Sequence, residues 1–407
     1  MANRNQLTNL LLIAVLLAAA APAVSTAADA APAAVTVDAL PADADAARQA
    51  QKLIDKGTAF LVSRQQPDGF WAGDKAPLGL NALVLKALAQ SPAYGYSHPA
   101  VRRGFDKLIA AQLQSGGIYK DTLACYNTAI AISALAAADN KDLRPAIDKA
   151  VNYLKGLQWT DAIAGPKGET IDPGNPWYGG FGYGGTSRGS GRPDLSNSQM
   201  ALDALHDSGL KADDLAYQAA LKFVTRLQNS SETNDQAWAG DDGGFVYGPS
   251  DDGKGESFAG EYTDANGRRL LRSYGAMTYA GIKSMIYAGL SKNDPRVKAG
   301  WTWITNNWTL DENPGIKAGN AGNSGYALYY YYHTLAKTLR AYNQPVITDS
   351  QGVRHDWRVE LITKLTALQH EDGSWAGEQK WMEDNPVLTT AYVVLALQEA
   401  QSSLSEK

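Results

Sequence analysis

The sequence has little of what disulfides, metal centres and nucleic-acid contacts require. Its 407 residues include one cysteine, Cys125, and 5 histidines. A single cysteine can form neither an intramolecular disulfide nor a cysteine cluster for zinc or iron–sulfur, and we expect it to be a buried small side chain. The 37 basic residues are outnumbered by 42 acidic ones, and the net charge of −5 disfavours nucleic acid as a partner. We therefore predict a fold that depends on packing, with no cofactor and no nucleic-acid ligand.

Long apolar runs are also scarce, and the one that stands out lies at the N-terminus. Arg4 precedes an apolar run over residues 10–21, and small residues around Ala27 suit a signal peptidase. A helix of this length spans about 18 Å, which is short of the roughly 30 Å of bilayer hydrocarbon. We predict a secretory signal peptide over residues 1–27 and an exported protein, periplasmic or secreted, without a transmembrane anchor after cleavage. Residues 28–46, rich in Ala, Asp and Pro, are predicted to be a flexible linker.

Glycine and aromatic residues, in contrast, are abundant and recur in a motif. The segment 66–71, Gln-Pro-Asp-Gly-Phe-Trp, returns over residues 369–375 as Gln-His-Glu-Asp-Gly-Ser-Trp. Weaker copies begin at Gln112, Gln158 and Gln228, and a degenerate copy begins at Asn307. The first three copies are 46 residues apart, and loop insertions lengthen the later spacings. Such self-similarity indicates a repeat array.

Each repeat predicts a pair of helices of different character. The first helices, such as 47–64, 99–113 and 143–157, carry their apolar residues on one stripe. The second helices are apolar or small on nearly every face, over residues 80–89, 122–138, 196–205, 274–290, 325–339 and 388–397. A helix that is apolar all round is buried all round. We therefore predict an all-α fold over residues 47–402, an (α/α)6 toroid with six inner helices enclosed by six outer ones.

Every loop from an outer to an inner helix must lie at one end of such a toroid. That end also collects the N-termini of the inner helices, whose free amide groups favour anions. We expect the mouth of a cavity there, because functional residues concentrate on loops that a rigid scaffold positions.

The repeat resembles that of a known group of proteins. The segment 56–71, Lys-Gly-x-x-Phe-Leu followed by Gln-x-x-Gly-x-Trp, resembles the Gln-Trp repeat of squalene and oxidosqualene cyclases and of protein prenyltransferase β subunits. The resemblance extends over residues 47–400 and implies a toroid with an aromatic cavity for an isoprenoid or other apolar ligand. It also implies a structural role for Gln66, Trp71, Gln369 and Trp375.

The catalytic acid of squalene-type cyclases lies in an Asp-x-Asp-Asp sequence at the start of an inner helix. Here the matching segment is Asp194-Leu195-Ser196-Asn197, in which Ser196 replaces the proton donor and Asn197 its supporting carboxylate. Asp194 is thus a weak catalytic candidate, and Ser196 and Asn197 are candidates for ligand binding. The alternative is that these residues cap a helix.

Prenyltransferases use a histidine on an inner helix as a zinc ligand, and the segment Tyr332-His333-Thr334 resembles that region. Gly275 and Met277 stand where the other two ligands would be, so the resemblance does not imply a zinc site here, and we predict no metal. His333 is a weak catalytic candidate or a hydrogen-bonded histidine in the cavity wall.

Basic and aromatic residues complete the candidate binding site. Arg268, Arg269 and Arg272 resemble the basic segment that holds a prenyl diphosphate in prenyltransferases, and Arg192 precedes the third inner helix. These four could hold a diphosphate or carboxylate, or serve only solubility. Aromatic rings on inner helices and mouth loops could grip an apolar ligand or simply fill the core, and the candidates are Tyr274, Tyr326 and Tyr332.

Two functional hypotheses follow. In the first, the protein binds, and in one version transforms, an isoprenoid or other apolar molecule in an open pocket that reaches from the third and fourth loops to His333. In the second, it is a noncatalytic scaffold with a filled centre that binds a protein or glycan through its loop face. Mouth carboxylates such as Glu383 and Asp384 leave a glycan-cleaving barrel open as well, since those enzymes use two carboxylates. No particular protein partner is indicated.

Overall fold

The computed structural model describes residues 43–73, 76–165, 168–184, 191–250, 253–316 and 326–405. The predicted signal peptide and residues 28–42 of the predicted linker lie outside these ranges. Residues 43–46, which we assigned to the linker, instead form the first turn of helix α1 (Asp43–Ser63). Ala46 and Ala50 of this helix are buried against the core. No helix in the described ranges combines the length and the apolar character that crossing a bilayer requires.

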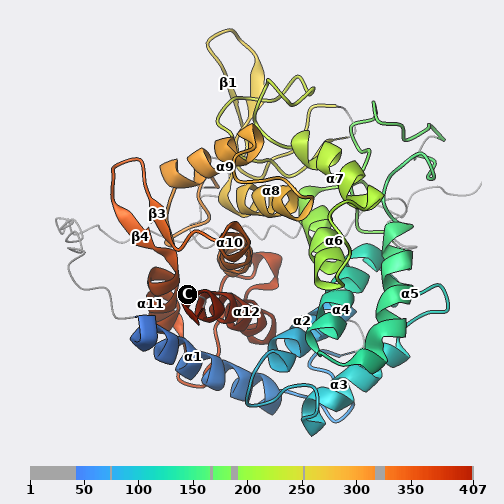
Figure 1. Cartoon of the computed structure of the whole chain (residues 1–407), viewed down its shortest axis with the longest axis vertical. Helices are drawn as coiled ribbons and strands as arrows, with labels where there is room; N and C mark the ends of the chain where they lie inside the picture. The colour runs from blue at the N-terminus through green and yellow to red at the C-terminus, as the bar shows by residue number, and fades with distance from the viewer. Residues whose placement is uncertain are drawn as a thin grey trace, which may run out of the picture. The chain divides into compact units, whose positions relative to one another are not determined.

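The predicted fold class is confirmed: outer and inner helices alternate along the chain and form two concentric rings (Figure 1). Within the described residues, the outer helices are α1, α3 (Pro99–Ala110), α5 (Arg144–Lys155), α7 (Leu215–Thr225), α9 (Pro295–Asn306) and α11 (Trp357–Leu368). The inner helices are α2 (Leu78–Ala89), α4 (Ala124–Ala137), α6 (Leu195–Asp207), α8 (Gly275–Tyr287), α10 (Leu328–Tyr342) and α12 (Pro386–Ser405). The last inner helix, α12, packs against both α1 and α2, so the ring is closed.

Burial separates the two rings as the sequence pattern predicts. Outer helix α3 buries one stripe, which includes Val101, Phe105 and Leu108. Inner helix α2 buries every residue from Leu78 to Leu88. An inner helix has neighbours on all sides, so it needs small or apolar residues on every face.

A glutamine fastens each outer helix to the next in five of the six repeats. Its Nε2 group donates to a carbonyl of its own loop and to a carbonyl of the next outer helix. The glutamines are Gln65, Gln112, Gln158, Gln228 and Gln369, and their acceptors on the next outer helix are the carbonyls of Ala100, Ala146, Ala216, Arg296 and Leu53. The first of these is Gln65 and not Gln66, for which the resemblance implied a structural role; Gln66 is exposed.

The fifth repeat replaces this fastener by a different contact. The side-chain amide of Asn307 donates to Trp303 O within its own helix and, among the described residues, to no other helix. In its place Trp308 Nε1 donates to Glu360 Oε2 of α11 at 3.1 Å. The degenerate copy of the motif thus keeps the link between outer helices with another residue pair.

The motif tryptophans are buried and hold the loop against the core. Trp71 Nε1 donates to Leu61 O, and Trp375 Nε1 donates to Leu365 O at 2.9 Å. The backbone amide of Trp375 donates to Thr390 Oγ1 at 3.1 Å, which ties the loop to inner helix α12. These contacts give both tryptophans a structural role, as the resemblance implies.

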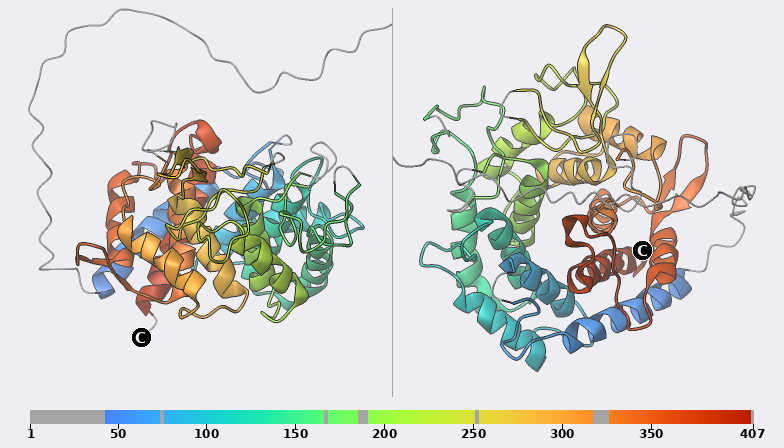
Figure 2. Two further views of the ribbon diagram at one scale, coloured as in Figure 1. Left: turned by 90° about the horizontal axis from the view of Figure 1, so that it is seen from above. Right: turned by 180° about the vertical axis from the view of Figure 1, so that it is seen from behind.

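Two short antiparallel hairpins, which the sequence pattern did not predict, decorate the ring. Strand β1 (Glu261–Thr263) pairs with β2 (Arg269–Leu271), with Tyr262 opposite Leu270, and the hairpin projects outward beyond α9 (Figure 1). Strand β3 (Val346–Thr348) pairs with β4 (Arg354–Asp356) before α11. Seen from the side, the long loops that lead into the inner helices gather at one end of the ring (Figure 2, left).

Candidate functional site

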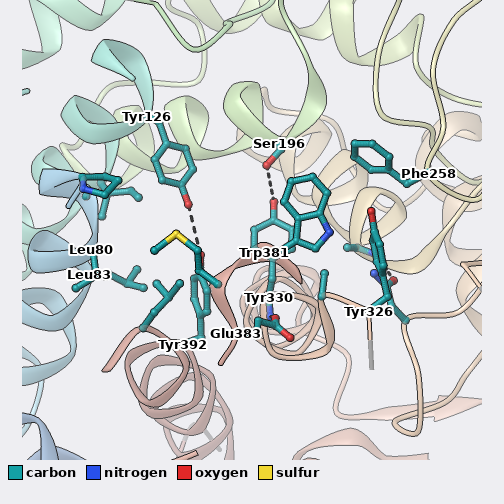
Figure 3. A pocket seen from close by; sticks show the side chains of 18 of the residues that line it. Leu80, Leu83, Tyr126, Ser196, Phe258, Tyr326, Tyr330, Trp381, Glu383 and Tyr392 are labelled. Carbon is teal, nitrogen blue, oxygen red and sulfur yellow. Dashed lines mark hydrogen bonds between the residues drawn. The ribbon is translucent and has the colours of Figure 1, made fainter. Parts of the chain in front are cut away.

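A cavity of about 380 Å³ lies inside the inner ring and is lined by residues from all six inner helices and from the loops above them (Figure 3). Nine of the described lining residues are aromatic: Tyr126, Tyr183, Tyr247, Phe258, Tyr274, Tyr326, Tyr330, Trp381 and Tyr392. The predicted open centre is therefore present, and a filled toroid is not what the structure describes.

One side of the cavity is a smooth apolar wall. Leu80 and Leu83 of α2, Ile130 of α4 and Leu388 of α12 form it. Between α4 and α12, the hydroxyl groups of Tyr126 and Tyr392 lie 3.4 Å apart (Figure 3). Helices α2, α4 and α12 are buried by the ring on their other faces and are apolar on nearly every face. The face that points into the cavity is therefore apolar as well.

The other side is a cluster of rings from three loops. The ring of Phe258 has its centroid 4.6 Å from that of Tyr247 and 5.5 Å from that of Trp381, and Trp381 lies 6.0 Å from Tyr326 (Figure 3). Trp381 belongs to the short 3-10 helix η2 (Lys380–Met382). Trp381 and Met382 both have left-handed backbone angles, with φ of 69° and 64°, and both are 46% exposed. A strained, exposed aromatic segment thus covers part of the mouth.

Glu383 follows this segment and is the one carboxyl group among the described residues that line the cavity. Its Oε1 accepts hydrogen bonds from the backbone amides of Tyr329 and Tyr330 and so caps α10. Its Oε2 is buried without a partner among the described residues. Burial raises the pKa of Glu383 to about 7, although the amide hydrogen bonds act to lower it. A carboxylic acid with this pKa can donate or accept a proton near neutral pH.

Asp194, the predicted catalytic candidate, lies outside the cavity wall. It caps α6, accepting hydrogen bonds from the backbone amide of Asn197 at 2.7 Å and from its Nδ2 at 2.8 Å. Burial raises the pKa of Asp194 to about 7. Of the predicted trio only Ser196 lines the cavity. The geometry of Asp194 and Asn197 is that of helix capping, the alternative we left open.

His333 also lies behind the wall. It is buried on α10, its ring centroid is 5.4 Å from that of Tyr392, and Tyr392 stands on the cavity side. Burial, followed by the nearby ammonium groups of Lys283 and Lys337, holds the pKa of His333 well below its usual value. The pocket therefore does not reach His333 as the first hypothesis predicted.

The predicted tyrosines divide in the same way. Tyr274 and Tyr326 line the cavity, whereas Tyr332 is fully buried with its hydroxyl donating to Leu310 O. Of the four consecutive tyrosines on α10, only Tyr330 lines the cavity. A helix turns by about 100° per residue, so its neighbours face other helices.

The predicted arginines are not among the residues that line the cavity. Arg268 pairs with Asp264 at 3.0 Å and Arg269 pairs with Glu261, both within the β1–β2 hairpin. The guanidinium group of Arg272 lies 5.0 Å from the centre of the Tyr262 ring. Arg192 lies just before α6, also outside the lining set.

At the N-terminus of each inner helix, where we expected an anion site, the protein itself accepts a hydrogen bond from at least one amide. Protein oxygens accept from the first turn of each helix. The acceptors are Asn127 Oδ1 for α2, Tyr183 O for α4, Asp194 Oδ1 for α6, Asn313 Oδ1 for α8, Glu383 Oε1 for α10 and Asn385 Oδ1 for α12. Capping by the protein itself leaves little for a bound anion to gain.

Metal ligands do not converge in the described part of the chain, where no three His, Cys, Asp or Glu side chains are grouped. Cys125 is fully buried, as expected, and burial raises the pKa of its thiol.

No protein-family model matches this sequence. Solved structures do match it in fold. The apo form of the type II terpene cyclase MstE from Scytonema is similar with a TM-score of 0.51 at 15% identity, over 88% of this chain and 99% of that one. A variant of that enzyme in complex with its substrate, geranylgeranyl dihydroxybenzoate, gives a TM-score of 0.52 at 16% identity over the same shares. The chain has a terpene cyclase-like toroid fold. This likeness at low identity establishes the fold alone.

The sequence analysis named Glu383 only as a mouth carboxylate of a possible glycan-cleaving barrel. It did not predict Glu383 as a residue of the apolar cavity. The signal was available in part, because Glu383 stands just before an inner helix. What the sequence does not reveal is that this side chain caps a different inner helix, α10, and that the residue also lines the cavity.

Proposed function

We propose that this protein binds an isoprenoid, or a similarly elongated apolar molecule, in its central cavity. The observation that carries the proposal is the cavity itself, whose volume of about 380 Å³ falls in the range of small-molecule sites. Its wall joins an aliphatic side, with Leu80, Leu83 and Ile130, to an aromatic side around Phe258. A fold neighbour that takes a geranylgeranyl compound as substrate supports the same class of ligand.

Glu383 is the group that we propose would act on such a ligand. A protonated carboxyl group can transfer its proton to one carbon of an alkene, whose π electrons form the new C–H bond. The transfer leaves a carboxylate and a carbocation, and the faces of neighbouring rings such as Tyr326 and Tyr330 would stabilise the cation. Loss of a different proton from the cation to the carboxylate gives a neutral, rearranged product and restores the acid. No co-reactant is needed, because the proton that returns to the carboxylate replaces the one that was donated.

Binding is tested by native mass spectrometry of the protein after incubation with geranylgeraniol, followed by extraction of what is released. We expect one ligand per chain. Leu83→Trp should fill the aliphatic side and weaken binding at least tenfold, while Arg272→Ala on the hairpin should bind as the wild type does. Binding that survives Leu83→Trp unchanged would place the ligand elsewhere and favour a scaffold that uses its loop face.

The acid role is tested separately, by incubating the bound isoprenoid with the protein in D₂O. We expect deuterium on one carbon of the recovered product. Glu383→Gln should abolish the incorporation and retain binding, since glutamine can still cap α10 through its carbonyl oxygen. Binding by the wild type without deuterium incorporation would reject the acid role and leave carriage as the function.

Export belongs to the same proposal and depends on residues 1–27. Intact-mass measurement of the protein from fractionated host cells should find a chain that has lost about these residues, outside the cytoplasm. A full-length cytoplasmic chain would contradict it.

A further inference from the structure

Two hydroxyl groups of the cavity wall face each other across the ring. Ser196 of α6 and Tyr330 of α10 both line the cavity, and Ser196 Oγ lies 3.1 Å from the Tyr330 hydroxyl (Figure 3). Among the described residues, Ser196 Oγ has no other hydrogen-bond partner. The direction of the hydrogen bonds between these groups decides whether the pair presents a donor or an acceptor to a ligand.

Buried residues behind the wall set that direction. Lys283 is 1% exposed, and its Nζ lies 2.8 Å from Asp203 Oδ2 and 2.6 Å from Gln199 Oε1. An ammonium group only donates, so it must face the oxygen of the Gln199 amide. The nitrogen of that amide therefore faces Tyr330, and Gln199 Nε2 donates to the Tyr330 hydroxyl at 3.1 Å.

A tyrosine oxygen that accepts from Gln199 must send its own proton elsewhere. If Tyr330 donates to Ser196, the serine proton is free to point into the cavity. If Ser196 donates to Tyr330 instead, the tyrosine proton points into the cavity. In either arrangement the series of hydrogen bonds that starts at Lys283 ends in an O–H donor that faces the ligand. Donation in one direction along such a series strengthens each successive donor.

We propose that the cavity selects an oxygenated ligand, an isoprenoid-like chain whose hydroxyl, carbonyl or ether oxygen accepts a hydrogen bond from the Ser196–Tyr330 pair. The proposal rests on the proposed function, because it presumes that an apolar ligand occupies the cavity. A pure hydrocarbon would cover the two hydroxyl groups without giving the donor an acceptor, and a buried donor without a partner is costly. An oxygen at one end of the ligand satisfies it and fixes the orientation of the chain.

The test compares farnesol with its deoxygenated hydrocarbon analogue, measured by quenching of tryptophan fluorescence in detergent-free buffer. We expect the wild type to bind farnesol at least tenfold more tightly than the hydrocarbon. The double variant Ser196→Ala/Tyr330→Phe should reduce this preference to threefold or less, because it loses the hydrogen bond to farnesol and no longer leaves a donor unpaired beneath the hydrocarbon. Tyr332→Phe is the matched control, since it removes a hydroxyl from the same helix outside the cavity and should keep the preference.

The outcomes separate this inference from the proposed function. A wild type that binds neither probe would overturn both. A wild type that binds both probes equally, or a double variant that keeps the preference for farnesol, would overturn only the selection of an oxygenated ligand. If the double variant does not fold, Ser196→Ala alone replaces it, and a preference for farnesol that is undiminished in Ser196→Ala with Tyr330 intact would show that serine is not the terminal donor and overturn the assignment to the pair.

Discussion

The Oε1 atom of Glu383 accepts a hydrogen bond of 2.8 Å from the backbone amide of Tyr330. Glu383 ends the exposed segment over the cavity mouth, and Tyr330 lies in the first turn of an inner helix and forms part of the cavity wall. The contact therefore couples the cover of the cavity to its wall, and it holds a carboxyl group where water is largely excluded.

Glu383 should make the stability of the protein depend on pH in an unusual direction. Its pKa is raised from 4.5 to about 7 in the folded state, so the folded state binds the proton more tightly than the unfolded state. The stabilisation is complete below about pH 4.5 and is lost as the pH rises through about 7, a change of about 3 kcal/mol. Urea unfolding between pH 4.5 and 8 should show this decline in the difference between the wild type and Glu383→Gln. A difference that is constant with pH would contradict it.

Gln65 and Gln66 form a matched pair in which only the first fastens two outer helices. The Nε2 group of Gln65 donates to Gly69 O at 2.8 Å and to Ala100 O at 2.7 Å. We expect Gln65→Ala to lower the free energy of unfolding by about 1 to 3 kcal/mol, because two carbonyls lose their donor. Gln66→Ala should change it by less than about 0.5 kcal/mol, as at other exposed positions. Equal effects in chemical denaturation would show that the glutamine contact is not the fastener.

A second matched pair compares a buried tryptophan with an exposed one. Trp71→Ala should cost about 3 to 5 kcal/mol of unfolding free energy, because the side chain is buried and anchors the first loop. Trp381→Ala should cost less than about 1 kcal/mol, because nearly half of its side chain is exposed. Thermal and urea unfolding of both variants test this.

In ligand titrations, Trp381→Ala should bind geranylgeraniol more weakly, and normal binding would remove Trp381 from the site.

The ion pairs behind the cavity should be far more sensitive to mutation than those on the surface. Lys337 Nζ lies 3.2 Å from Asp203 Oδ2 and 3.3 Å from Asp207 Oδ2, and its side chain is 7% exposed. Lys337→Met leaves two buried carboxylates short of a partner and should cost about 3 to 5 kcal/mol. Arg268→Met breaks an exposed pair on the hairpin and should cost at most about 1 kcal/mol. Comparable losses in urea unfolding would mean that the buried group is solvated in solution.

The sequence predicted the ring well because its pattern is local. An inner helix such as α2 is apolar on all faces and an outer helix such as α3 on one, and this difference can be read from residues 78–110 without knowing their partners. The choice between Gln65 and Gln66 could not be read in this way. Both are adjacent polar residues at a helix end, and which one reaches Ala100 depends on the geometry of a helix some 35 residues later.

The candidate site was predicted only in part, because its members are chosen by long-range packing. Tyr274 and Tyr326 line the cavity as predicted. Tyr332 and His333 lie on the same inner helix as Tyr330, but they are buried away from the cavity. The arginines of the β1–β2 hairpin find carboxylates and a ring within the hairpin, which the spacing of charges in the sequence does not reveal. Conversely, Glu383 gains its place through a contact with a helix more than 50 residues earlier in the chain.

The bond from Gln369 to Leu53 O joins the last repeat to the first, so the array has no terminal repeat. An open solenoid needs capping repeats with a polar outer face and can grow or shrink by whole units. In this ring α12 packs against both α1 and α2, so a helix pair cannot be added at an end without breaking that contact. The loops can change in length without disturbing it. Because those loops surround the cavity mouth, insertions there can change what enters the cavity while the ring that holds it stays the same.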